Sequence, residues 1–205
     1  YEARLQRLAQ DIYAHREENP VILISGPSGS GKTTTALKLE KLLDSWGCET
    51  HTLSMDNYFH PFDEEQRQRA ARGEIDLESP ARVDADLLSR QLRDIIRRRP
   101  VRLPKYDFTT SQRVYPGAML ERRSGDLVIL EGIHALNPDV VQIPDESSAR
   151  LYISVRMRVA DGGLVLHPAK IRLLRRMVRD RLYRSRSVEE TLRLYDSVQR
   201  GEGLY

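Results

Sequence analysis

Short apolar runs alternate with longer amphipathic stretches along this chain. Val21-Ile22-Leu23-Ile24 is a run of four apolar residues, and comparable short segments recur at Thr50–Ser54, Asp126–Glu131 and Leu151–Val155. Runs of this length, rich in β-branched residues, are typical of strands buried in a parallel sheet. The pattern therefore predicts a central sheet whose strands are far apart in the sequence.

Helical periodicity fills the intervals between these runs. Apolar residues recur three and four positions apart at 2–18, 32–46, 84–97, 168–183 and 188–200, and residues 64–72 read as a charged helical piece. Asn19-Pro20 and Gly47 follow the first two of these stretches and indicate where the helices end. Strands that alternate with helices predict an α/β fold with crossover helices.

Residues 101–122 break this alternation. Three short extended segments at 101–108, 113–115 and 119–122, with a turn at Pro116-Gly117, predict a small β excursion outside the main sheet. The chain shows no internal repeat and no low-complexity segment.

Composition narrows the class of protein. A chain of 205 residues, 40% hydrophobic and 31% charged, fits one globular domain. Its longest apolar runs are too short to cross a membrane and no secretory signal opens it, so we expect a cytoplasmic protein without a membrane partner. Cys48 is the only cysteine, which excludes an internal disulfide and a zinc site built from cysteines.

The charge does not by itself indicate a nucleic-acid partner. The formal net charge is only +3, although residues 172–186 contain seven arginines. An anionic small molecule accounts for that cluster as well as a polynucleotide does. A nucleic-acid-binding NTPase stays an alternative, and it predicts strongly salt-dependent binding.

A glycine-rich loop between the first predicted strand and the next helix carries the clearest chemistry. The residues are Gly26, Pro27, Ser28, Gly29, Ser30, Gly31, Lys32 and Thr33, which match the phosphate-binding spacing in full. Glycines let successive N–H groups point at phosphates, and the helix that begins near Lys32 adds its positive dipole end. The segment 26–33, here called the phosphate loop, predicts ATP binding on a three-layer α/β/α fold of the P-loop NTPase class, with a mainly parallel five-stranded sheet.

Three further residues are candidates for the metal and the chemistry. Thr33 ends the phosphate loop with a hydroxyl suited to Mg²⁺, and Glu131 closes a buried strand where it could hold the same ion through water. Asp56 follows the second strand and could accept the proton of an attacking hydroxyl or share the metal. Thr34 joins the phosphate-binding set, although the position also fits an ordinary helix residue. Asp56 also fits a helix cap.

Arginines form the fourth candidate group. Arg172, Arg175, Arg176 and Arg179 share one helical face, and Arg184 and Arg186 follow. Such residues can close over the γ-phosphate and stabilise charge during transfer, so residues 168–200 predict a helical lid. A solvated charged face is the alternative.

Several ordered motifs together resemble the uridine kinase and phosphoribulokinase family of P-loop kinases, from about Val21 to the end of the chain. Besides the phosphate loop they are Ser-Met-Asp-Asn-Tyr-Phe (54–59), Pro-Lys-Tyr-Asp-Phe (104–108), Leu-Glu-Gly-Ile-His (130–134) and Arg-Arg-Met-Val-Arg-Asp (175–180). The Tyr-Asp-Phe segment is closer to bacterial uridine kinase-like nucleoside kinases than to phosphoribulokinases.

The resemblance implies a role for each matched residue. Asp56 is implied as the base for a ribose 5′-hydroxyl, Lys32 as the cation on the transferred phosphate, and Arg176 and Arg179 as catalytic lid residues. The implied substrate contacts are Asp56, Tyr58, Glu78, Tyr106, Phe108 and Arg176. Arg184 and Arg186 are implied to bind the phosphates of ATP.

The chain departs from the family at two positions. Ser111 stands where uridine–cytidine kinases carry a histidine that reads the base, and Leu194 stands where a glutamine is expected. A pocket discriminates through paired polar groups, so these departures bear on pyrimidine specificity. Glu78 is one methylene longer than the usual aspartate.

The expected function is an ATP- and Mg²⁺-dependent kinase that phosphorylates the 5′-hydroxyl of a nucleoside, uridine first, with a homo-oligomer as a further option. Two alternatives stay open: a kinase acting on a sugar phosphate or pantothenate, with Lys105 and Arg113 as candidate anion contacts, and a regulatory module that binds nucleotide without turnover. We expect residues 1–20 to form an N-terminal helix connected to an upstream region. Residues 21–205 then form the kinase domain, without the family's last strand and helix.

Overall fold

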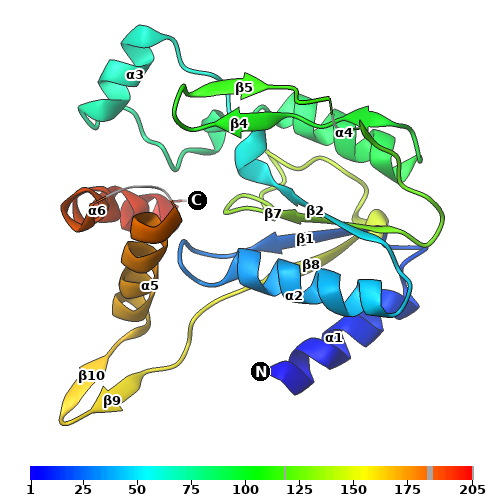
Figure 1. The fold of residues 1–205 in the computed structure, drawn as a ribbon, viewed down its shortest axis with the longest axis horizontal. Coiled ribbons are helices and arrows are strands. Elements are labelled where there is room, and N and C mark those ends of the chain that lie inside the picture. Colours follow the sequence, from blue (N-terminus) through cyan, green and yellow to red (C-terminus); the bar gives the residue numbers. More distant parts are fainter. Residues whose placement is uncertain (118, 184–186, 205) are drawn as a thin grey trace.

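A parallel sheet forms the centre of the computed structural model, which describes residues 1–117, 119–183 and 187–204. Its strands are β1 (Val21–Ser25), β2 (Thr50–Ser54), β7 (Leu127–Glu131) and β8 (Ser148–Tyr152). They lie in the order β2-β7-β1-β8, and every neighbouring pair is parallel (Figure 1). The carboxyl ends of β1, β2 and β7 therefore meet at one edge of the sheet.

The α/β class is confirmed, but two details of the sheet differ from the prediction. The described residues form four parallel strands in this sheet, whereas five were expected, because the other short strands pair only among themselves. The last strand begins at Ser148 and not at Leu151, since its register pairs Val21 with Ser148 and Ser25 with Tyr152. That strand is half-exposed, so its apolar residues do not form the continuous run that marks a buried strand.

Helices cover both faces of the sheet. On one face lie α1 (Glu2–Ala14) and α2 (Lys32–Ser45), and on the other lies α4 (Ala85–Ile96) (Figure 1). Because successive side chains of a strand point to opposite faces, Ile22 and Ile24 pack in one core and Val21 and Leu23 in the other. The three-layer α/β/α arrangement follows directly from this alternation.

The N-terminal helix belongs to one of these cores. Leu5, Ala9 and Ile12 lie three and four positions apart on α1 and are buried together with Leu39 and Leu43 of α2. The 2–18 helix is confirmed in a shorter form that ends at Ala14. Whether residues 1–20 also connect to an upstream region stays a prediction.

Shorter elements surround the carboxyl edge of the sheet. After β2 come the 3₁₀ turn η1 (Met55–Tyr58), α3 (Glu64–Ala71) and the turn η2 (Pro80–Arg82). The β excursion is confirmed as two antiparallel pairs, β3 (Val101–Arg102) with β6 (Met119–Leu120) and β4 (Lys105–Asp107) with β5 (Gln112–Val114). A third turn, η3 (Asp145–Ser147), precedes β8.

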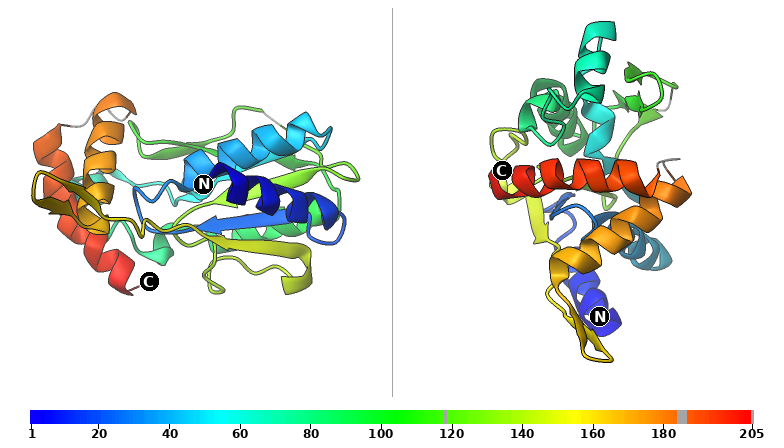
Figure 2. Two further views of the ribbon diagram at one scale, coloured as in Figure 1. Left: turned by 90° about the horizontal axis from the view of Figure 1, so that it is seen from below. Right: turned by 90° about the vertical axis from the view of Figure 1, so that its left-hand side faces the viewer.

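The predicted helical lid forms the far end of the molecule. It consists of α5 (Pro168–Tyr183) and α6 (Val188–Leu204), which lie across the end of the sheet where β1 meets α2 (Figures 1 and 2). Tyr195 of α6 donates its hydroxyl to the carbonyl of Ala169 at 2.8 Å, which ties the two helices together. The sequence did not predict the hairpin of β9 (Val159–Asp161) and β10 (Leu164–Leu166) that leads into α5. Among the residues that the structure describes, no helix combines the length and apolar character that a membrane crossing requires.

Candidate active site

The phosphate loop joins β1 to α2 and has the backbone shape that anion binding needs. Gly29 and Gly31 have φ angles of +75° and +104°, in the left-handed region that favours glycine. A Cβ on Gly29 would lie 2.7 Å from the carbonyl oxygen of Arg172, so no larger residue fits beneath the lid. Gly31 is the N-cap of α2, whose free N–H groups point toward an anion at this position.

Polar side chains of the phosphate loop fit a phosphate ligand. The Lys32 ammonium donates to the carbonyls of Gly26 at 2.8 Å and Pro27 at 3.3 Å, which places its charge over the loop. The hydroxyl oxygen of Ser30 is buried and has no hydrogen-bond partner within residues 1–117, 119–183 and 187–204. A buried polar atom without a partner is costly, and a bound phosphate would satisfy it.

Three strand ends bring the acidic candidates together. Register pairs Glu131 with Ile24 of β1 and with Ser54 of β2, so its carboxylate lies beside the phosphate loop. Burial raises the pKa of Glu131 above its usual value, and the negative charge of Asp56 adds to the effect. Lys32 and hydrogen bonds from Ser54 and Thr33 act in the opposite direction.

These oxygens suit a magnesium ion. Carboxylate and hydroxyl oxygens are the protein ligands that Mg²⁺ prefers. A cation here would stabilise the ionised form of Glu131, which burial disfavours. The donor set of Thr33, Glu131 and Asp56 therefore fits the metal that the sequence implied.

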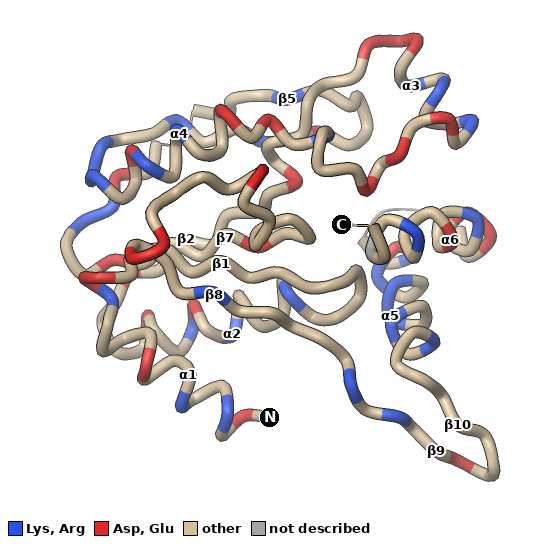
Figure 3. The backbone as a smooth tube through the Cα atoms, turned by 180° about the vertical axis from the view of Figure 1, so that it is seen from behind, with Lys and Arg blue, Asp and Glu red and all other residues tan. Residues whose placement is uncertain are grey.

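The arginines of α5 contact the phosphate loop directly, so they do not form a purely solvated face. Arg176 is buried and donates to the Ser28 hydroxyl at 2.7 Å, and Arg172 reaches the Ser28 carbonyl at 3.2 Å. Asp180, which is fully buried, forms ion pairs with Arg176 at 3.5 Å and with Arg179 at 2.7 Å. Figure 3 shows the basic residues spaced along α5.

A cavity of about 850 Å³ connects these groups. Its nucleotide end is lined by residues of the phosphate loop and of α2 and by the lid residues Arg175, Arg176 and Arg179. Asp56 and Glu131 line the cavity as well. The part of the cavity lined by Phe59, Phe62, Tyr106 and Phe108 is called the acceptor end. Of the predicted phosphate-binding residues, the ones that line the cavity are Ser28, Gly29, Gly31, Lys32, Thr33 and Thr34.

Aromatic residues form the wall of the acceptor end. The ring of Tyr106 packs edge to face against Phe59 at 5.7 Å and against Phe108 at 5.2 Å between centroids. Phe108 is 55% exposed, so part of its ring is available to a ligand. Asn57 accepts a hydrogen bond from the Tyr106 backbone N–H at 3.2 Å, which holds β4 against η1.

The predicted ribose-binding acid also lies in this cavity. Glu78 lines it, and the Glu78 carbonyl contacts Nε2 of buried His134 at 2.7 Å. Burial lowers the pKa of His134, which favours the neutral ring. Ser111 and Leu194, the two positions that depart from the family pattern, line the cavity as well.

Three predicted residues are placed differently or not described. Tyr58 does not line the cavity: it is 1% exposed in the core, and its hydroxyl donates to Gln91 at 2.9 Å. The physical reason is that η1 is a 3₁₀ turn, so the side chains of Asp56 and Tyr58 point in different directions and only that of Tyr58 is buried. Arg184 and Arg186 lie outside the described residues.

Sequence reasoning missed Arg82. This arginine on η2 is buried and lines the acceptor end of the cavity. Its guanidinium lies 3.6 Å from the ring centroid of Phe62. Arg82 belongs to no motif and stands in a stretch that reads as irregular, so no periodicity could have indicated it.

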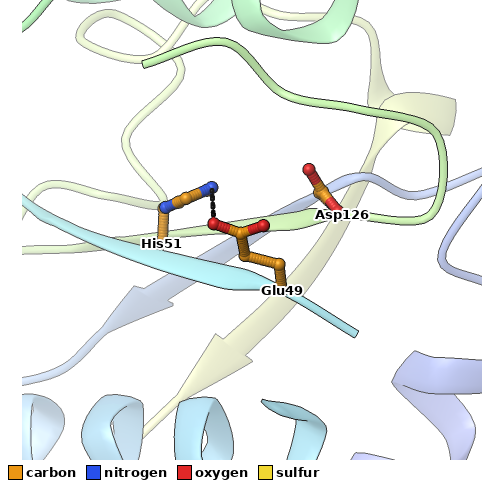
Figure 4. A group of neighbouring side chains, drawn as sticks. All are labelled: Glu49, His51 and Asp126. Atoms are coloured by element: carbon orange, nitrogen blue, oxygen red, sulfur yellow. Dashed lines mark ion pairs between the residues drawn. The ribbon is translucent and has the colours of Figure 1, made fainter. Parts of the chain in front are cut away.

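A second cluster of potential ligands lies at the opposite edge of the sheet. Glu49, His51 and Asp126 come from the starts of β2 and β7, and their ligand atoms lie within 4.8 Å of one another (Figure 4). The Asp126 carboxylate already accepts the Arg123 N–H at 2.8 Å, and Glu49 is exposed. Because it lies at the opposite edge of the sheet, the cluster is separate from the candidate active site.

Comparisons with known proteins show which family and fold the chain is similar to. Residues 21–201 match the Phosphoribulokinase / Uridine kinase family. The chain is 31% identical over 180 residues to uridine kinase of Staphylococcus aureus (strain JH9), covering 88% of this chain and 77% of that protein. It is 28% identical over 200 residues to uridine-cytidine kinase 2-B of Danio rerio, covering 95% and 70%. A solved structure of D-glycerate 3-kinase from Cryptococcus neoformans superposes with a TM-score of 0.62 at 16% identity, covering 97% of this chain and 87% of that one, which shows the shared fold.

Proposed function

The chain belongs to the phosphoribulokinase / uridine kinase family, and we propose that it transfers the γ-phosphate of ATP to a hydroxyl group of a small molecule held beside Asp56. Family membership indicates a kinase with an alcohol acceptor and the use of ATP. The observation that carries the proposal is the single cavity in which the phosphate loop, Glu131 and Asp56 meet an aromatic wall.

Each step of the transfer has a residue in this cavity. Asp56 takes the proton from the acceptor hydroxyl, whose oxygen then attacks the γ-phosphorus while the bond to ADP breaks. Lys32 and the α5 arginines neutralise the charge that spreads over the phosphate oxygens. Mg²⁺, held by Thr33 and Glu131 with Asp56 near it, would supply further neutralisation.

Two classes of acceptor have specific support. The names of the relatives and the aromatic wall of Phe59, Tyr106 and Phe108 favour a nucleoside, with uridine as the first compound to test. Arg82 at the same end of the cavity favours an anionic acceptor. Ser111 and Leu194 leave both classes open, because neither side chain is the base reader of uridine–cytidine kinases.

ATP consumption against a panel of uridine, ribulose 5-phosphate and pantothenate tests the proposal. One acceptor should stimulate ADP release, and Asp56→Asn should lower kcat by about 10²- to 10⁴-fold while ATP binding is kept. Asp139→Asn, which removes an exposed carboxylate outside the cavity, serves as the control. ATP binding without acceptor-dependent release of ADP would instead support a regulatory module.

We propose a location in the cytoplasm and a single kinase domain over residues 21–205. A homo-oligomer and the absence of a nucleic-acid partner are kept as hypotheses for sizing and binding measurements.

A further inference from the structure

Among the residues whose side chains the structure describes, one arginine in the acceptor end of the cavity has no acidic partner. Arg82 is only 9% exposed and lines the cavity, yet none of the ion pairs in the described part of the chain involves it. A buried guanidinium is costly unless a negative charge compensates it. Burial accordingly lowers the pKa of Arg82.

The neighbours of Arg82 hold it in place without neutralising it. Its Cζ lies 3.6 Å from the ring centroid of Phe62 and 5.4 Å from that of Phe59, so the guanidinium is stacked on aromatic faces. Nη2 of Arg82 donates to the Tyr106 hydroxyl at 3.4 Å. A guanidinium that is fixed by stacking keeps its remaining N–H groups preorganised for a planar anion.

The other arginines around the cavity differ from Arg82 in this respect. Arg67 also lines the acceptor end, but it pairs with Glu64 and donates to the Thr110 carbonyl. Arg113, a candidate anion contact from the sequence, forms an ion pair with Asp84 at 2.9 Å and does not line the cavity. Lys105, the other candidate, does not line it either.

From this contrast we infer that Arg82 binds an anionic group of the acceptor, a carboxylate or a phosphate. The inference rests on the proposed kinase function and names the substrate class for the same cavity. The acceptor then carries a hydroxyl at Asp56 and an acid at Arg82, with the Tyr106 hydroxyl as a second donor to that acid. Neutral nucleosides become poor acceptors, in contrast to what the names of the relatives suggest.

Matched acid and neutral compounds provide the test. The carboxylate arms compare D-glycerate with glycerol and pantothenate with pantothenyl alcohol, the phosphate arm compares ribulose 5-phosphate with ribulose, and uridine represents the neutral nucleosides. Binding to the full chain is measured calorimetrically with Mg²⁺ and a non-hydrolysable ATP analogue, and turnover is measured with ATP. The arm with the largest difference identifies the acid.

In the wild type, the acid of at least one pair should bind about 100-fold more tightly than its neutral partner. Arg82→Met should remove this preference and leave the affinity for the ATP analogue unchanged. Arg82→Lys should recover part of the preference, because it restores the charge without the planar fork. Arg67→Met is the matched control and should keep the preference, and thermal unfolding of each variant checks that it folds.

Either of two results would overturn the inference. One is that no acid binds better than its neutral partner, and the other is that uridine is phosphorylated with the same kcat/KM by the wild type and by Arg82→Met. Failure of the proposed function looks different: an acid would bind through Arg82, but no acceptor would stimulate ATP consumption.

Discussion

The buried guanidinium of Arg176 donates to the hydroxyl of Ser28 at 2.7 Å and so joins the lid to the phosphate loop. The two residues lie 148 positions apart in the sequence. Arg172 and Arg175 add further links, at 3.2 Å to the carbonyl of Ser28 and at 3.4 Å to the carbonyl of Ser30. Because the lid rests on the loop backbone, changes in the loop should alter both nucleotide binding and the position of the lid.

Comparing Gly29→Ala with Gly73→Ala should separate the disturbance of the lid from the cost of backbone strain alone. Gly29 and Gly73 both have φ of +75°, but a Cβ on Gly29 would meet the Arg172 carbonyl at 2.7 Å, whereas one on Gly73 meets nothing within 4 Å. Each alanine should cost about 1–2 kcal/mol in the free energy of unfolding. Only Gly29→Ala should also lower kcat/KM for ATP, by about 100-fold. Equal kinetics for the two variants would show that a side chain at position 29 does not disturb the lid.

The pH dependence of stability should report the burial of Glu131. Its pKa in the folded protein lies above the ordinary value of 4.5, so the folded state holds this proton more tightly than the unfolded state. Its contribution to stability is therefore complete below pH 4.5 and is lost as the pH rises through the folded pKa.

Urea unfolding without Mg²⁺ measures this contribution. The free energy of unfolding of the wild type minus that of Glu131→Gln should decrease as the pH rises from about 4 to about 8. Glu146→Gln, at an exposed position on η3, controls for the loss of a surface carboxylate. A difference that increases with pH would contradict the assignment.

Gly201 and Gly203 on α6 test the contact between the lid and the acceptor end. A Cβ on Gly201 would lie 2.5 Å from Cβ of Glu78, whereas one on Gly203 meets nothing within 4 Å. Alanine at either helical position gains about 1 kcal/mol in helix propensity. Gly203→Ala should therefore stabilise the protein with unchanged kinetics, and Gly201→Ala should raise the acceptor KM by displacing Glu78. An unchanged acceptor KM in Gly201→Ala would mean that Glu78 does not position the acceptor.

Tyr58→Phe tests the placement of that residue in the core. The change removes the 2.9 Å hydrogen bond to Gln91 and leaves a buried amide oxygen without that donor. The free energy of unfolding should fall by about 1–3 kcal/mol, while the acceptor KM stays unchanged. Tyr152→Phe, on an exposed side chain, is the control and should alter neither quantity. A raised acceptor KM in Tyr58→Phe would return this residue to the substrate-binding set.

The sequence by itself determined the features that depend on local order. The phosphate loop needs glycine, lysine and threonine at fixed spacing between a strand and a helix, and all of these lie within about a dozen residues. Asp56 follows one strand and Glu131 closes another, and parallel strands end at one edge of the sheet, so their convergence could be predicted. The β excursion and the helices of the lid also follow from local periodicity.

Only the tertiary structure decided what depends on contacts between distant segments. Tyr58 and Phe59 are neighbours, yet Tyr58 packs in the core and Phe59 lines the cavity, because the turn η1 and the packing of α4 select one face for each. Arg82 carries no local signal, and the role inferred for it follows from its burial without an ion pair among the described residues. Charge compensation and burial are properties of three-dimensional neighbours. For this reason the phosphate loop, Tyr106 and Phe108 could be predicted from the sequence, but the place of Arg82 in the cavity could not.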